Sequence, residues 1–165
     1  MRIYLPATSA LLRTLAETSA IGPAPLTAFA VTPGLREWYV DDEVEELEYA
    51  ASNEAARSSL RLLDADPSAR RRRVVISLDA PEGAVTIRDD LDRGVVQLTE
   101  PVRLEQVAAF HIDDEDAEMT VAAAAELVDR ADIGDSDAQA AVDDAEGFEL
   151  SWYAPQELEL LLAGL

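Results

Sequence analysis

The stretch from Thr32 to Leu63 most constrains what this chain can fold into, because it contains the longest helical pattern in the sequence. Thr32 and Pro33 predict a helix start, with threonine as the N-cap and proline in the first turn. Asp42, at a second predicted N-cap, precedes apolar residues that recur at helical spacing from Val44 to Leu63. A helix this long buries one face, so the rest of the chain must supply a sheet for it.

Short apolar or alternating runs elsewhere in the chain predict that sheet. They lie at residues 2–6, 26–31, 70–80, 84–87, 95–98, 107–112 and 148–153. Further helices are predicted near residues 9–19, where Thr8 or Ser9 can serve as the N-cap, near residues 115–130 and 136–145, and at the C-terminus. We therefore predict one α+β domain, residues 1–165, built as a two-layer sandwich. Its mixed sheet has about five or six strands, with helices mostly on one face and a ferredoxin-like arrangement as the leading topology.

The charge balance limits the partners, because 34 acidic residues face 13 cations, all of them arginine, for a net charge of −21. Such a surface repels phosphates and anionic lipids, so we expect neither direct nucleic-acid binding nor membrane binding. Most of the excess acid lies in residues 81–165, and the acidic surface could keep the protein soluble, reflect a salt-adapted proteome, bind a cationic partner or imitate a nucleic acid. The absence of cysteine and of long apolar runs predicts a soluble, cytoplasmic protein.

The single histidine, His111, lies one residue before the end of the predicted strand 107–112 and is followed closely by Asp113 and Asp114. One interpretation is a carboxylate-lined ligand, metal or general-base site at a strand end. The other is an ordinary strand histidine followed by acids that favour a helix N-terminus. Because there is no second histidine and no cysteine, we predict no metal centre, no cofactor and no catalytic residue.

Two further groups of residues could contact a ligand. Arg71 and Arg73 belong to the only basic cluster, which could clamp a phosphate or carboxylate, or pair with acids from an edge strand. Those acids could lie on this chain or on a partner. Trp38 and Trp152, each followed by tyrosine, could stack on a ligand or belong to the core with polar tips at its rim. Both pairs of interpretations stay open.

Several strings along the chain have a family resemblance: MRIYLPAT, AFAVTPGLREWY, EELEYAA, SLRLL and LSWYAPQEL. They resemble a family of short, uncharacterised actinobacterial proteins that is classed as a domain of unknown function. The resemblance covers nearly the whole chain and implies a bacterial, stand-alone domain. It brings no activity, cofactor or catalytic residue.

The sequence thus predicts a non-enzymatic, acidic interaction or structural domain that self-associates or binds a protein partner. The alternative is a small ligand- or metal-binding protein or enzyme with a carboxylate-lined site near His111. A second alternative is an acidic nucleic-acid mimic. None of the three is decided by the sequence.

Overall fold

The computed structural model describes residues 1–40 and 43–165, so Asp42, the predicted helix cap, lies outside the described residues. The strands are β1 (Arg2–Ala7), β2 (Ala20–Ile21), β3 (Leu26–Phe29), β4 (Val74–Asp79), β5 (Val85–Ile87), β6 (Val95–Leu98), β7 (Val102–Arg103), β8 (Val107–Ile112) and β9 (Ser151–Tyr153). The helices are α1 (Ser9–Thr18), α2 (Pro33–Trp38), α3 (Val44–Ala65), α4 (Glu118–Asp132), α5 (Ser136–Glu146) and α6 (Leu158–Ala163). Single 3₁₀ turns lie at Glu82–Ala84, Leu104–Gln106, Glu115–Ala117 and Pro155–Glu157.

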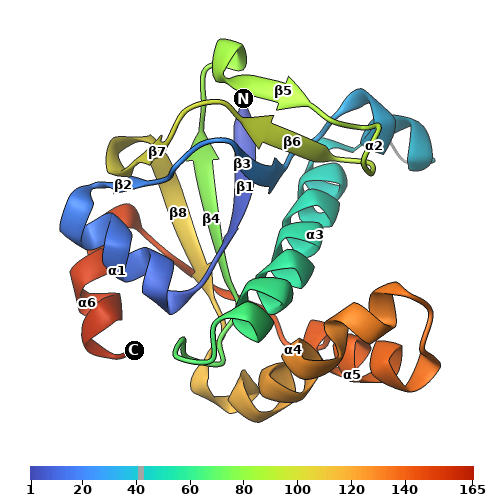
Figure 1. The fold of residues 1–165 in the computed structure, drawn as a ribbon. Helices are drawn as coiled ribbons and strands as arrows, with labels where there is room; N and C mark the ends of the chain where they lie inside the picture. The colour runs from blue at the N-terminus through green and yellow to red at the C-terminus, as the bar shows by residue number, and fades with distance from the viewer. Residues whose placement is uncertain (41–42) are drawn as a thin grey trace.

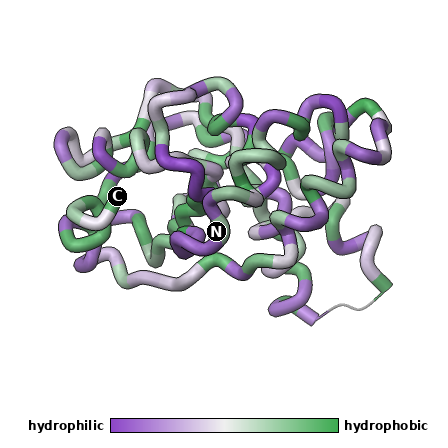
Figure 2. Tube along the Cα trace, turned by 90° about the horizontal axis from the view of Figure 1, so that it is seen from below, coloured by the Kyte–Doolittle hydropathy of each residue, from purple (hydrophilic) through white to green (hydrophobic). Residues whose placement is uncertain are grey.

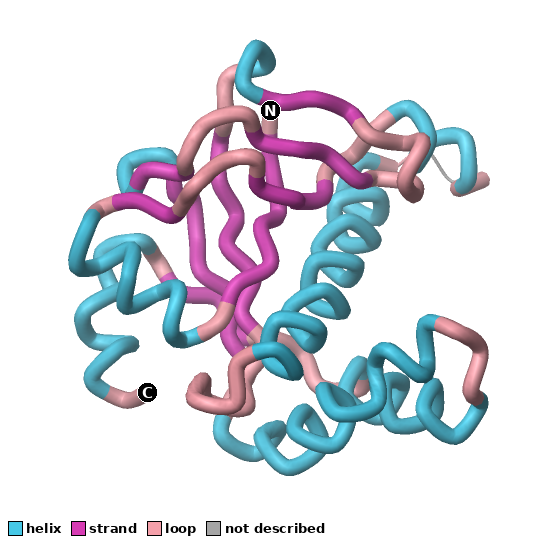
Figure 3. Tube along the Cα trace, in the orientation of Figure 1, coloured by secondary structure: helices cyan, strands magenta, loops and turns pink. Residues whose placement is uncertain are grey.

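Within the described chain, seven strands form one sheet in the order β5-β6-β3-β1-β4-β8-β9, and β2 pairs with β7 separately (Figure 3). Every neighbouring pair in the described sheet is antiparallel. The predicted mixed sheet of five or six strands is therefore wrong in both respects. The short strands β5 and β9 form the two edges of this sheet. Very short strands are common at sheet edges.

Strand β1 lies between β3 and β4 and is antiparallel to both, so β3 and β4 run in the same direction. Helices α2 and α3 connect them and cross the sheet, which makes a β-α-β unit split by β1. One such unit leaves the ferredoxin-like arrangement a prediction. The long helix predicted first is thus the crossover that spans one face of the sheet.

Helices cover both faces of the sheet, so the prediction of helices mostly on one face is wrong. Alternation along β1 places Ile3 on the face that packs against Leu12 of α1 and Leu158 of α6. Tyr4 points to the opposite face and packs with Leu47 of α3. Figure 1 shows α3 on one side of the sheet and α1 with α6 on the other.

Helices α4 and α5 pack on each other and extend the far end of α3, where Leu60 and Leu63 join Val121 and Val142 in a separate apolar cluster. The chain trace alternates between hydrophilic and hydrophobic residues along much of its length (Figure 2), as expected when each element buries only one side. None of the helices described is long and apolar enough to cross a lipid bilayer.

The N-cap residues correctly predicted where two helices begin. The side chain of Thr8 accepts a hydrogen bond from the Leu11 amide at the start of α1. Thr32 caps α2 in the same way, accepting from the amide of Leu35 at 3.2 Å. Both predicted N-caps are confirmed, because a cap depends only on residues three positions apart.

Candidate functional site

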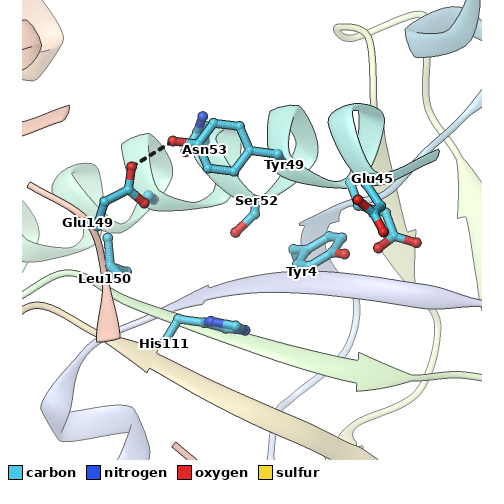
Figure 4. Close-up of a pocket in the computed structure, with 10 residues that line it drawn as sticks. Tyr4, Glu45, Tyr49, Ser52, Asn53, His111, Glu149 and Leu150 are labelled. Carbon is cyan, nitrogen blue, oxygen red and sulfur yellow. Dashed lines mark hydrogen bonds between the residues drawn. The ribbon is translucent and has the colours of Figure 1, made fainter. Parts of the chain in front are cut away.

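A polar cavity of about 320 Å³ lies between α3 and the sheet. Its floor is formed by Tyr4 of β1 and His111 of β8 (Figure 4). The two residues share a face because Tyr4 pairs in register with Ser77, and His111 with Val75, two positions away on β4. Strand alternation therefore turns both ring side chains toward α3.

The wall of the cavity is one stripe of α3, formed by Glu45, Glu48, Ser52 and Ala56. These positions are three or four residues apart, which places their side chains above one another on a single helix face. The neighbouring stripe of α3 buries Leu47 and other apolar residues against the sheet. The apolar stripe of α3 thus packs against the sheet, and the other stripe faces the cavity.

The far end of the cavity is closed by the segment after α5. Glu149 and Leu150 line the cavity there, and the Tyr49 hydroxyl donates a 2.9 Å hydrogen bond to Glu149 (Figure 4). The same segment is also held by Arg73, whose guanidinium donates a hydrogen bond to the Phe148 carbonyl oxygen at 3.0 Å. The cavity is therefore assembled from four parts of the chain that are far apart in sequence.

The cavity is electronegative, since Glu45, Glu48 and Glu149 line it and none of its described lining residues is an arginine. Burial and the nearby Glu48 carboxylate raise the pKa of Tyr4 to about 12. The Tyr4 phenol therefore stays neutral at physiological pH. The closest cation noted beside Tyr4 is Arg2, whose guanidinium pairs with Asp79 at 2.9 Å.

His111 is fixed by Ser77, whose Oγ lies 2.6 Å from His111 Nε2. Burial, with a contribution from the Arg2 charge, lowers the pKa of His111, so the imidazole is neutral near pH 7. A serine and a histidine at this distance could form a nucleophile–base pair. Ser77, however, is only 2% exposed and lies in the middle of a central strand. The contact therefore orients the imidazole rather than presenting a hydroxyl to a substrate.

Asp113, predicted as a ligand residue beside His111, instead forms a buried ion pair with Arg73. Asp113 accepts from the Arg73 guanidinium at 2.8 Å, and the two side chains are 0% and 3% exposed. Its carboxylate also accepts from the Arg73 backbone amide at 2.7 Å. The pair ties β4 to β8 and leaves neither charge facing the cavity. Asp114 accepts a hydrogen bond from Ser151 at the start of β9.

The basic cluster precedes β4 rather than forming part of it, because the strand begins at Val74. Strand β4 lies in the interior of the sheet, so the predicted edge strand is wrong. Pairing with acids of the same chain is correct: both Arg70 and Arg72 pair with Glu118. Arg71 donates to the carbonyls of Leu63 and Ala69 and so closes the C-terminal end of α3.

Both tryptophans lie on the surface, which makes the predicted core role wrong. Trp38 is 60% exposed and stacks against the Arg93 guanidinium, 3.6 Å from the ring centroid. Trp152 is 62% exposed and pairs in register with His111, which puts its ring on the α3 face of the sheet. Trp152 is therefore beside the cavity at the sheet edge, whereas Trp38 lies at the end of α2.

Within the part of the chain that the structure describes, no three His, Asp or Glu side chains gather closely enough to hold a metal ion. Sequence reasoning singled out His111 but missed Tyr4, Tyr49 and Glu149 as lining residues. The spacing of Glu45 and Glu48 was the one available signal, since it places two acids on one helix face.

The chain resembles one protein family along almost its full length. The profile of a family of unknown function (DUF6912) matches residues 1–162. No match is found among curated proteins. None is found among solved structures either.

Proposed function

The chain belongs to the family of unknown function (DUF6912), and on that premise we propose that it is a non-enzymatic binding domain. Its ligand is an organic cation, carrying an ammonium or guanidinium group, bound in the cavity between α3 and the sheet. One observation carries the proposal. Three carboxylates and two tyrosine rings surround a single hollow in which no described lining residue is an arginine.

The physical argument is charge neutralisation in a partly dehydrated space. Glu45 and Glu48 lie one helical turn apart and repel each other, and a bound cation relieves that repulsion. The rings of Tyr4 and Tyr49 line the same hollow, and an aromatic face attracts a cation by about 0.5–2 kcal/mol. A neutral ligand would gain neither contribution. The site therefore favours cations over neutral molecules of the same shape.

The arrangement of His111 supports binding over catalysis. General base catalysis needs a base within hydrogen-bond reach of the proton that it removes. His111 Nε2 is instead engaged by the buried Ser77 hydroxyl. We assign the imidazole to the floor of the site, where its neutral form adds polarity without adding a positive charge.

Ethylguanidinium and its neutral isostere ethylurea test the proposal directly. We expect ethylguanidinium to bind in calorimetric titration and to raise the melting temperature, and ethylurea to do neither. The Glu48→Gln variant should weaken ethylguanidinium binding about tenfold, because a charged hydrogen bond contributes roughly 1.5–3 kcal/mol. Added salt should weaken binding further through screening.

Glu126→Gln is the matched control, since it removes the same charge from an exposed position on α4 that does not line the cavity. It should leave ethylguanidinium binding unchanged. Equal binding of ethylguanidinium and ethylurea would reject the proposal. So would equal losses in the Glu48 and Glu126 variants, because the attraction would then be a property of the net charge alone.

We also propose that the domain works in the cytoplasm of an actinobacterium. The support is compositional: thirteen arginines with no lysine, and no cysteine. Fractionation of a native host with an antibody to the chain would test the location. Self-association stays a prediction, and light scattering across a range of protein concentrations would test it.

A further inference from the structure

A shallow channel runs along the outer side of α3, next to the cavity. It consists of two hollows, of about 510 and 340 Å³, which are continuous because they share Tyr39, Tyr49, Ala50 and Asn53 as lining residues. Tyr49 and Asn53 also line the cavity. The channel therefore leads past the mouth of the proposed cation site.

The channel combines acidic and apolar surface. Glu43, Glu45 and Glu46 line one hollow, and Glu146 and Glu149 line the other. Two arginines also line the second hollow, but their charges are met within the chain. Arg57 binds Asp132 and Gln139 and also lies 3.9 Å from the Glu146 carboxylate, and Arg73 binds Asp113. The net character of the channel is negative.

Exposed rings distinguish this channel from a purely electrostatic surface. Tyr39 is 40% exposed and Tyr49 is 54% exposed, and both line the channel. Val44, which is 50% exposed, lies at the adjacent start of α3. A polyamine would need only the carboxylates. Amphipathic tyrosine rings beside carboxylates instead suit a polypeptide that carries both apolar and basic side chains.

We infer that the cation bound in the cavity is an arginine side chain of a basic protein partner, whose backbone lies in the channel along α3. This inference rests on the proposed function, because the cavity must first accept a cation. A second copy of this chain is a poor occupant, since it carries the same net charge of −21. Its only basic cluster is also engaged, with Arg70 and Arg72 bound to Glu118.

The test offers three kinds of cation to the full chain. The probes are ethylguanidinium, spermidine, and an end-blocked heptapeptide with a central arginine flanked by leucine and lysine. A fourth probe is the same peptide with citrulline, the neutral isostere, in place of arginine. We expect the arginine peptide to bind at least about tenfold more tightly than ethylguanidinium, because it adds contacts in the channel. Citrulline should remove most of that affinity.

Variants separate the channel from the cavity. Tyr39 and Glu46 line the channel but not the cavity, whereas Glu48 lines the cavity but not the channel. Tyr39→Ala and Glu46→Gln should weaken the peptide several-fold and leave ethylguanidinium unchanged. Glu48→Gln should weaken both probes by a similar factor. Tyr39 and Glu46 are exposed, so these variants are expected to fold.

Each remaining outcome overturns one of the two claims. If ethylguanidinium binds but the peptide binds no more tightly, or spermidine equals the peptide, the partner inference is wrong and the cation site stands. If the peptide binds without any dependence on Glu48, the inference is also wrong, because its arginine is then not in the cavity. If no cation binds at all, the proposed function itself fails.

Discussion

Asp113 and Glu48 are both acidic residues on or beside the sheet, yet their surroundings are opposite. Asp113 is fully buried and bound by the Arg73 guanidinium at 2.8 Å. Glu48 lines an open cavity in which no described lining residue is an arginine, and it raises the pKa of the neutral Tyr4 phenol. The comparison divides the acids of this chain into those that hold the fold and those that remain available to a ligand.

The largest expected effect comes from breaking the buried pair. Asp113→Asn leaves the Arg73 charge buried without its partner, and we expect a loss of about 3–5 kcal/mol in the free energy of unfolding. Urea denaturation measures it. Asp114→Asn is the control: its side chain is exposed and bonds only Ser151, so a change within about 0.5 kcal/mol is expected. Similar losses in the two variants would contradict the assignment of Asp113 to the fold.

A smaller effect is expected at Asp132, which joins α4 to α3. Hydrogen bonds from Arg61 and then Arg57 hold the pKa of Asp132 below its usual range. Because the side chain is 31% exposed, solvent screens the pairs, and Asp132→Asn should cost only about 1 kcal/mol. High salt should shrink the difference. A loss as large as that of Asp113→Asn would show that burial is not what separates the two pairs.

The pH dependence of stability tests the floor of the cavity. Burial lowers the pKa of His111 in the folded chain, so below its ordinary value of about 6.5 the unfolded chain binds a proton that the folded chain resists. Stability should therefore fall as the pH drops below about 6.5. The lowered carboxylate pKa values, as at Asp132, act only at lower pH, where protonation removes their contribution.

His111→Asn should flatten the curve of urea midpoint against pH below about pH 6.5, because asparagine does not titrate. An unchanged slope in this variant would assign the acid sensitivity to other groups. Binding of ethylguanidinium should weaken only at the lower pH at which the folded chain protonates His111, since that imidazolium adds a positive charge to the floor of the cavity.

What could be predicted from the sequence was local. The caps at Thr8 and Thr32 depend on residues three positions away, and both are confirmed. The strand predicted over residues 70–80 began too early, because alternation continues through the arginines. The interactions that keep the strand from beginning before Val74 are not local. Arg72 forms an ion pair with Glu118, and Arg73 forms one with the buried Asp113.

The cavity shows more clearly what local sequence patterns cannot predict. Glu45 and Glu48 are visible in sequence as one helix face, but the same spacing also occurs on ordinary solvated helices. Tyr4, His111 and Glu149 reach the cavity from β1, β8 and the segment before β9. Their meeting depends on the strand order, which periodicity does not encode. Sequence reasoning therefore singled out His111 of the floor, but it could not predict that Tyr4 and the acids of α3 would lie around it.

The smallest expected effect on stability is also the one that bears most directly on the contrast between the buried Asp113 and the cavity residue Glu48. Glu48→Gln removes a carboxylate that faces Glu45 one helical turn away, so it relieves repulsion instead of breaking an ion pair. The free energy of unfolding should change by no more than about 0.5 kcal/mol, in the stabilising direction. Urea denaturation at low salt measures the change, with Glu126→Gln as the charge-matched control. A loss of more than about 1 kcal/mol would place Glu48 with Asp113 among the acids that hold the fold. A stabilising result, together with weaker cation binding, would mean that this acid is kept at a cost to stability and serves the ligand.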